Sequence, residues 1–95
     1  MSKILFNTPV VATAGVHHQM MNDKKFNQFV TRCLVKHFSG DFGSIPENEI
    51  EMNLEAIKNN LDRVSSVYKN SLGKKIYIIT DGEPRHTTIL FPSEY

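Results

Sequence analysis

Residues 64–91 read VSSVYKNSLGKKIYIITDGEPRHTTILF, and this stretch decides the predicted fold. Residues 64–69 alternate with a two-residue period, residues 75–80 are nearly continuous in β-forming side chains, and residues 86–91 form a third such segment. The segments are separated by short turns rich in Asn, Gly, Asp and Pro, and turns of this length join antiparallel neighbours. The sequence therefore predicts a three-stranded antiparallel meander.

Two amphipathic helices are predicted upstream of this meander. The first begins after Asn22 or Asp23, either of which can cap a helix through its side-chain oxygen. It ends at Gly40, which can adopt the left-handed conformation that closes a last turn. Its apolar positions recur at the spacing of one helical face and are Phe26, Phe29, Val30, Cys33, Leu34 and His37. We expect this face to be buried and the polar side chains of the helix to face solvent.

The second helix is predicted over about residues 46–61. Ser44 and Glu47 have the spacing of a capping box, and glutamates crowd the first turns, where the positive end of the helix dipole favours carboxylates. The apolar positions of this helix are Ile50, Leu54, Ile57 and Leu61. These side chains are predicted to face the core.

The N-terminal part of the chain adds a further strand to this prediction. Residues 4–13 are rich in β-branched side chains, but Pro9 has no N–H to donate to a neighbouring strand. Any strand here therefore lies at a sheet edge or begins at Val10. Residues 17–21 are compatible with a helical turn.

Together these elements predict an α+β fold in which two helices pack on a small, mainly antiparallel sheet of three or four strands. Two amphipathic helices need a sheet face to cover, which gives a two-layer sandwich. The chain of 95 residues shows no repeat and no linker, and its length is typical of one domain. We expect a single domain over residues 1–95.

The overall charge argues against nucleic-acid binding. Eleven basic and ten acidic residues give a formal net charge of +1, whereas nucleic-acid-binding proteins usually carry a basic face that neutralises phosphates. Such a function would require Lys69, Lys74, Lys75 and Arg85 on one face. Nucleic acid is therefore not the expected partner.

The N-terminal segment and the cysteine content favour a cytoplasmic protein. The apolar stretch near the N-terminus is interrupted at residues 7–9, so neither a signal peptide nor a membrane span is expected. Cys33 is the single cysteine, so it cannot form an intramolecular disulfide. Cys33 lies on the apolar face of the first helix, where a thiol behaves as a core side chain with a raised pKa.

No spacing of reactive side chains indicates catalysis, a metal site or a cofactor. The four histidines and the cysteine have none of the spacings that place metal ligands on one face. His37 and Asp41 are close in sequence at a helix end, where a carboxylate and the negative helix terminus would raise the imidazole pKa. We favour a C-cap interaction there over a catalytic pair, and assign no catalytic residue.

Two regions are candidates for a binding site. The first is the loop Gly40-Asp41-Phe42-Gly43, whose backbone amides before the second helix could hold an anion; the alternative is a tight connection whose Phe42 plugs the core. The second is the polar end of the sheet, where the alternative is that threonines serve as ordinary strand formers. The candidate binding residues are His37, Asp41, Phe42, Arg63, Tyr68, Thr80, Arg85 and Thr88.

A set of ordered segments carries a resemblance to a known family. They are residues 29–37, the Gly40–Gly43 loop, Asn53, residues 63–68, residues 76–80 and the C-terminal run Thr87-Thr88-Ile89-Leu90-Phe91-Pro92-Ser93-Glu94-Tyr95. Together they resemble a family of small bacterial proteins often encoded on plasmids, integrated elements or prophages, and they cover nearly the whole chain. The family pattern has Trp at the position of Phe42, so an indole N–H is not required there. The resemblance implies a mobile-element context and no particular activity.

Two functional hypotheses remain. The leading one is a non-enzymatic protein-binding or regulatory module whose partner is a host protein, since catalytic spacing and cofactor motifs are lacking. The alternative is a small-molecule-binding or hydrolytic domain with its site near the Gly40–Gly43 loop and the Thr80 and Arg85 end of the sheet. Such a site would gather Asp41, Arg63, Thr80, Arg85 or His86 into one concavity. An exposed edge strand would also allow a homodimer.

Overall fold

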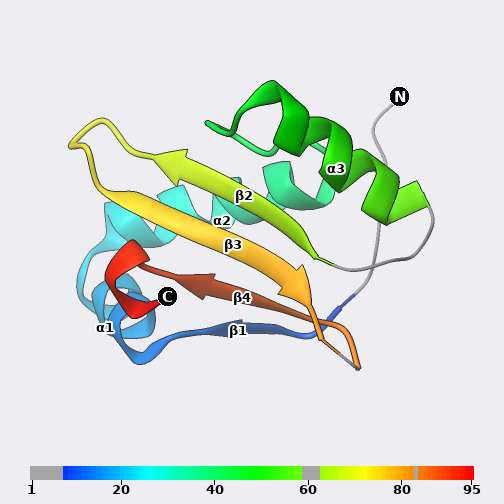
Figure 1. Ribbon diagram of the computed structural model, residues 1–95. Helices are drawn as coiled ribbons and strands as arrows, with labels where there is room; N and C mark the ends of the chain where they lie inside the picture. The colour runs from blue at the N-terminus through cyan, green and yellow to red at the C-terminus, as the bar shows by residue number, and fades with distance from the viewer. Residues whose placement is uncertain (1–7, 59–62, 83) are drawn as a thin grey trace.

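The computed structural model describes residues 8–58, 63–82 and 84–95, which form one four-stranded sheet with three α-helices and a C-terminal 3₁₀ turn (Figure 1). The elements in chain order are β1 (Val10–Ala12), α1 (Ala14–Asn22), α2 (Lys24–Phe38), α3 (Glu47–Lys58), β2 (Val64–Lys69), β3 (Lys75–Asp81), β4 (His86–Leu90) and η1 (Pro92–Glu94). The predicted α+β class is confirmed. Within the described ranges no helix is long and apolar enough to cross a membrane.

The strand order in the sheet is β1-β4-β3-β2. The strands β2, β3 and β4 form the predicted antiparallel meander, in which Val64 pairs with Thr80 at one end of β2 and Lys69 pairs with Lys75 at the other. Strand β1 begins at Val10, as predicted, but it pairs with β4 in parallel. The sheet is therefore mixed, with one parallel pair, β1–β4, and two antiparallel pairs.

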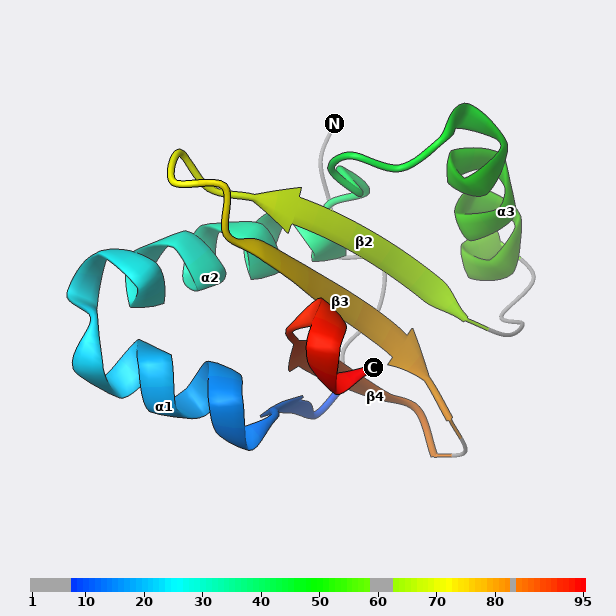
Figure 2. The same ribbon diagram turned by 60° about the vertical axis from the view of Figure 1, so that its left-hand side comes forward.

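Helices α1 and α2 cover one face of the sheet, as Figure 2 shows. α1 is a full helix where the sequence indicated a single turn, so three helices are present instead of two. The Asp23 carboxylate caps α2 by accepting a hydrogen bond from Phe26 N at 3.1 Å. The residues that α2 buries are Phe26, Val30, Cys33 and His37, and this confirms the predicted apolar face.

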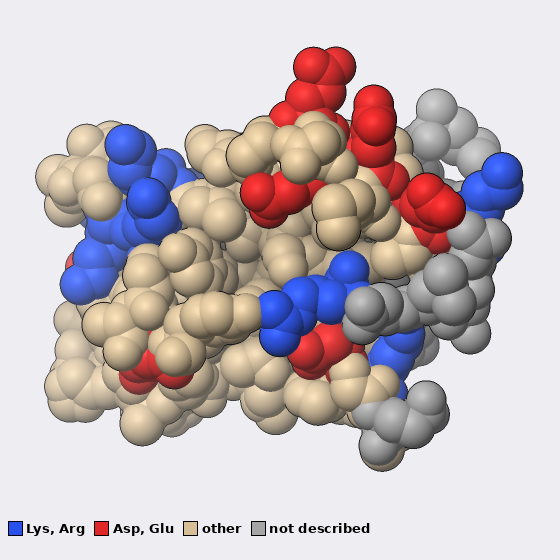
Figure 3. Space-filling model, in the orientation of Figure 1, with Lys and Arg blue, Asp and Glu red and all other residues tan. Residues whose placement is uncertain are grey.

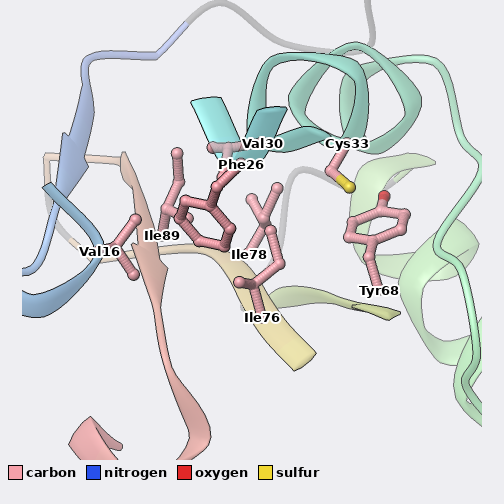
Figure 4. Close-up of a cluster of buried hydrophobic side chains, with 8 residues drawn as sticks. All are labelled: Val16, Phe26, Val30, Cys33, Tyr68, Ile76, Ile78 and Ile89. Atoms are coloured by element: carbon pink, nitrogen blue, oxygen red, sulfur yellow. The ribbon is translucent and has the colours of Figure 1, made fainter. Parts of the chain in front are cut away.

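The main core lies between these two helices and the sheet (Figure 4). Its buried side chains are Val16, Phe26, Val30, Cys33, Tyr68, Ile76, Ile78 and Ile89. Burial of a large apolar side chain contributes about 1.5–3 kcal/mol, so this cluster is a principal source of stability. Burial also raises the pKa of the Cys33 thiol to about 11, which confirms the prediction of a protonated core cysteine.

Helix α3 packs beside the edge strand β2 on a smaller cluster formed by Phe42, Ala56 and Val64. The Asn53 side chain joins helix and strand: its Nδ2 donates to Ser65 O at 2.8 Å, and its Oδ1 accepts from Ser65 N at 3.1 Å. This pair of bonds satisfies backbone groups at the outer edge of β2.

The predicted core face of α3 is partly wrong. Ile50 and Ile57 pack against the smaller cluster, but Leu54 is 51 % exposed, and the residues that α3 buries are Asn53 and Ala56. The amide of Asn53 must face the edge of β2 to pair with its backbone, and this sets the rotation of the helix. Leu61 and residues 4–7, which also carried predictions, lie outside the described residues.

Candidate functional site

A chain of hydrogen-bonded polar side chains runs through the interior near the C-terminal end of α2. His37 Nδ1 lies 2.5 Å from Ser66 Oγ, and His37 Nε2 lies 2.9 Å from Thr80 Oγ1. The chain continues from Thr80 Oγ1 to Thr87 Oγ1 at 2.7 Å, and from there to Thr8 Oγ1 at 2.5 Å. We refer to these five residues as the buried polar network.

The network is satisfied by the protein itself. His37, Ser66, Thr80 and Thr87 have no exposed surface, and burial lowers the pKa of His37 to about 4. The imidazole is therefore neutral at pH 7, with one donor and one acceptor nitrogen, and each hydroxyl can donate once and accept twice. Among the described residues, every buried side-chain nitrogen and oxygen has a hydrogen-bond partner.

The expectation that Asp41 raises the pKa of His37 is wrong. The His37 ring lies against hydroxyl groups, and its burial lowers the pKa because the charged form would lose its hydration. Asp41 is exposed, and its Oδ1 accepts a hydrogen bond from Gly43 N at 3.2 Å. The short sequence separation predicts an interaction between the Asp41 carboxylate and the His37 imidazole, but the rotation of α2 directs the imidazole into the core.

The Gly40–Gly43 loop connects the end of α2 to the sheet by contacts to the core. Phe42 is 3 % exposed, and its ring meets that of His37 edge-on with centroids 6.4 Å apart. The Tyr68 hydroxyl donates to Asp41 O at 2.6 Å, and burial raises the pKa of Tyr68. These contacts support the structural alternative for the loop, in which Phe42 fills the core.

The same loop covers the outer edge of β2. Val67 N donates to Phe42 O at 3.1 Å, and Ser44 N donates to Val67 O at 2.8 Å. Gly43 lies between these bonds with φ 73°, and a Cβ there would meet Val67 O at 2.0 Å. The loop and α3 therefore cover the β2 edge of the sheet. The other edge is the three-residue strand β1.

The C-terminal segment is tied to the start of α1 by Glu94. Its Oε1 accepts from Thr13 Oγ1 at 2.6 Å and from Phe91 N at 3.0 Å, and its Oε2 accepts from Gly15 N at 3.1 Å. Thr13 is the N-cap residue of α1 but makes no capping bond with its own side chain. Glu94 thus takes the role of a capping carboxylate from a distant part of the sequence.

A groove with a volume of about 930 Å³ lies between α2 and the hairpin that joins β2 to β3. Its charged lining residues are Asp23 at the N-cap of α2, Lys25, Arg32 and Lys36 along the helix, Lys69 at the end of β2 and Lys74 in the turn before β3. We call this concavity, with five cations and one carboxylate, the basic groove.

The cations of the basic groove have no counterion from the rest of the described chain. The ion pair found within residues 8–58, 63–82 and 84–95 joins Arg63 to Asp81, outside the groove. The one groove carboxylate, Asp23, is engaged as the cap of α2. On the face drawn in Figure 3, one group of Lys and Arg lies at the hairpin end and several Asp and Glu lie over α3, with further charges of both signs elsewhere. A nearly neutral chain thus carries a local cluster of cations at the groove.

The eight predicted binding residues do not form one surface. Four of them are buried: His37, Phe42, Tyr68 and Thr80. Thr88 is half-buried on the sheet face opposite His37, Asp41 is exposed, and Arg85 lies in the β3–β4 turn. The Arg63 side chain donates hydrogen bonds to Asp81 and to the Tyr95 hydroxyl. Of the eight, Tyr68 alone lines the basic groove. Lys25, Arg32 and Lys36 share one face of α2, which is a sequence signal for the groove cations, but a polar helix face is ordinarily solvated and does not by itself indicate a site.

Comparison of the chain with family models, curated proteins and solved structures gives no match. Among the described residues, no group of three or more His, Cys, Asp and Glu side chains could hold a metal ion. Function is therefore inferred from the geometry and charge of the buried polar network and the basic groove.

Proposed function

We propose that this protein is a non-enzymatic binding module that holds an acidic segment of a partner protein in the basic groove. The observation that carries the proposal is the set of five cations, unpaired within the described chain, around a concavity of about 930 Å³. Like charges lining a concave surface focus the field and attract a ligand of opposite sign.

The positions of the reactive side chains favour binding over catalysis. The Cys33 thiol is buried and has a pKa of about 11, so it is not a nucleophile at neutral pH. The His37 imidazole is also buried, and its nitrogens lie within hydrogen-bond distance of Ser66 and Thr80. The alternative, a small-molecule or hydrolytic site near the Gly40–Gly43 loop, has less support because Phe42 and Thr80 are part of the interior.

The groove favours a protein ligand over nucleic acid. Single-stranded nucleic acid is held by aromatic side chains on which bases stack. Of the three aromatic residues in the groove wall, Phe26 and Tyr68 are 2 % and 4 % exposed and Phe29 is half-buried, so none offers a fully exposed ring. An apolar side chain, Leu72, is 89 % exposed at the groove, where it can contact the aliphatic part of a peptide. The resemblance to mobile-element proteins adds the expectation that this partner is a host protein.

The proposal is tested by affinity capture from host lysate with three tagged proteins. The groove variant carries Arg32→Glu and Lys69→Glu, and the matched control carries Lys24→Glu and Lys58→Glu, two reversals at exposed positions outside the groove. We expect one host protein to be retained by the wild type and the control and lost by the groove variant.

Circular dichroism first verifies that all three proteins are folded. Retention of the same partner by the groove variant would contradict the proposal. If the captured material is degraded by nuclease and its retention falls steeply at higher salt, nucleic-acid binding would replace the proposed function.

A further inference from the structure

The charge pattern of the basic groove specifies its ligand further. We infer that the groove selects an extended, uninterrupted run of about five acidic residues, in preference to acidic residues scattered along a chain. This inference rests on the proposed function and names the chemistry of the partner segment.

The length of the run follows from the cations on α2. Lys25, Arg32 and Lys36 lie on one face of the helix and line the groove. Eleven residues separate the first from the last, which corresponds to about 16 Å along the helix axis. An extended peptide rises about 3.3 Å per residue, so about five residues cover this distance.

The need for consecutive acidic residues follows from the two walls. Lys74 lines the groove from the turn before β3, on the side opposite the α2 cations, and Lys69 lines it at the end of β2. Successive side chains of an extended peptide point to opposite sides, so neighbouring carboxylates would meet opposite walls. A run with a neutral residue at every second position would leave one of the two walls without partners.

Arg32 and Lys74 differ from the other cations in what they offer a ligand. The Arg32 guanidinium can hold a carboxylate with two parallel hydrogen bonds, which the lysines cannot. Lys74 Nζ lies 4.6 Å from the centroid of the Phe91 ring, which is not a lining residue of the groove, so this ammonium group is already engaged in a cation–π contact. We therefore expect the loss of Arg32 to weaken binding more than the loss of Lys25.

Several exposed contacts are needed because each is weak. A single solvent-exposed ion pair contributes little, so the expected Kd is about 10–100 μM. Binding at this strength should fall when salt screens the charges.

The experiment is a fluorescence-anisotropy titration of the full chain with three labelled probes. The first peptide contains five consecutive glutamates between Gly-Ser flanks, and the second has the same length and composition with the glutamates separated by Gly or Ser. The third probe is an oligothymidylate of equal net charge. We expect the consecutive peptide to bind about tenfold more tightly than the spaced one, and Arg32→Glu to weaken it about tenfold while Lys58→Glu leaves it unchanged.

Equal affinity for the two peptides would overturn the inference, because the groove would then respond to total charge alone. Tighter binding of the oligothymidylate would overturn it in favour of nucleic acid. If neither peptide binds while host-protein capture still depends on Arg32 and Lys69, the inference fails and the proposed function stands. If capture is also independent of these two residues, both fail.

Discussion

The buried polar network and the basic groove are both rich in polar side chains, and they differ in what satisfies those side chains. In the network, His37 contacts Ser66 and Thr80, and the hydroxyl chain continues to Thr87, all without exposed surface. In the groove, five exposed cations surround a concavity and form no ion pair with another described residue. Polar residues with complete internal partners stabilise the fold, and we propose that the groove cations, which form no ion pair within the described chain, bind a ligand.

This difference follows from the cost of burial. A buried polar group without a partner costs about 1–3 kcal/mol, so interior residues such as Thr80 and Thr87 must bond one another. Exposed lysine and arginine are hydrated and incur no such cost. Spatial clustering of unpaired charge on a surface is therefore a better indicator of function than burial of a histidine.

The largest expected effect concerns acid stability through His37. Its pKa is lowered to about 4 in the folded protein, whereas an unfolded histidine has a pKa of about 6.5. As the pH falls, the unfolded chain takes up the proton first, so the stabilisation is complete above pH of about 6.5 and decreases down to about 4. Denaturant unfolding at pH 7 and pH 4 should show a loss of about 3 kcal/mol through this group.

Two variants isolate the contribution of His37. His37→Gln should be less stable at pH 7, because Gln cannot reproduce both ring contacts, and its free energy of unfolding should change less between pH 7 and pH 4. His17→Gln removes an exposed histidine and should keep the wild-type dependence. An equal acid loss in His37→Gln and the wild type would show that the imidazole is not held neutral by burial.

The second effect tests the boundary between the two regions, where Gly43 both lines the groove and bridges β2. Gly43→Ala should lower the free energy of unfolding by about 2 kcal/mol more than Gly73→Ala, because the new Cβ overlaps Val67 O. Gly73 is the matched control: its φ of 83° is also positive, but a Cβ there meets nothing within 4 Å. Urea unfolding at neutral pH measures both variants.

Equal losses in the two variants would indicate that backbone conformation alone, and not the close approach to Val67, requires glycine at position 43. The loop would then accommodate the new Cβ by a small displacement from Val67 O, with its backbone bonds to β2 retained.

The fold was predictable where the signal is local. The meander of residues 64–91, the N-cap at Asp23 and the buried face of α2 all follow from periodicity and turn residues within a short window. The parallel pairing of β1 with β4 was not predictable, because it joins segments from opposite ends of the chain. The exposure of Leu54 was missed for a similar reason, since the pairing of Asn53 with Ser65 sets the rotation of α3.

The candidate site was less predictable than the fold. The periodicity places His37 on the buried face of the first predicted helix, but the two hydroxyls that it contacts belong to β2 and β3, which lie far along the chain. The basic groove requires Lys69 and Lys74 to lie across from α2, which depends on how the hairpin packs on the helix. Net charge gave no indication of it, because the acidic residues of α3 balance the total.

The smallest expected effect concerns Glu94, a surface charge that has protein partners. Glu94→Gln removes the charge that caps α1, and it should lower the melting temperature slightly and speed amide exchange in the first turn of that helix. Hydrogen bonds from Thr13, Phe91 and Gly15 lower the pKa of Glu94. The stabilisation is therefore present above the ordinary pKa of glutamate and is lost as the pH falls through the folded-state value.

Glu51→Gln, at an exposed position on α3, is the matched control and should leave exchange in α1 unchanged. Neither substitution should alter binding of the acidic peptide, because neither residue lines the basic groove. If Glu94→Gln behaves like the control, a surface carboxylate with three hydrogen-bond partners would contribute no more to stability than a carboxylate without partners. The number of internal partners would then no longer separate structural from functional charge, and the groove cations would have to be distinguished by their concavity alone.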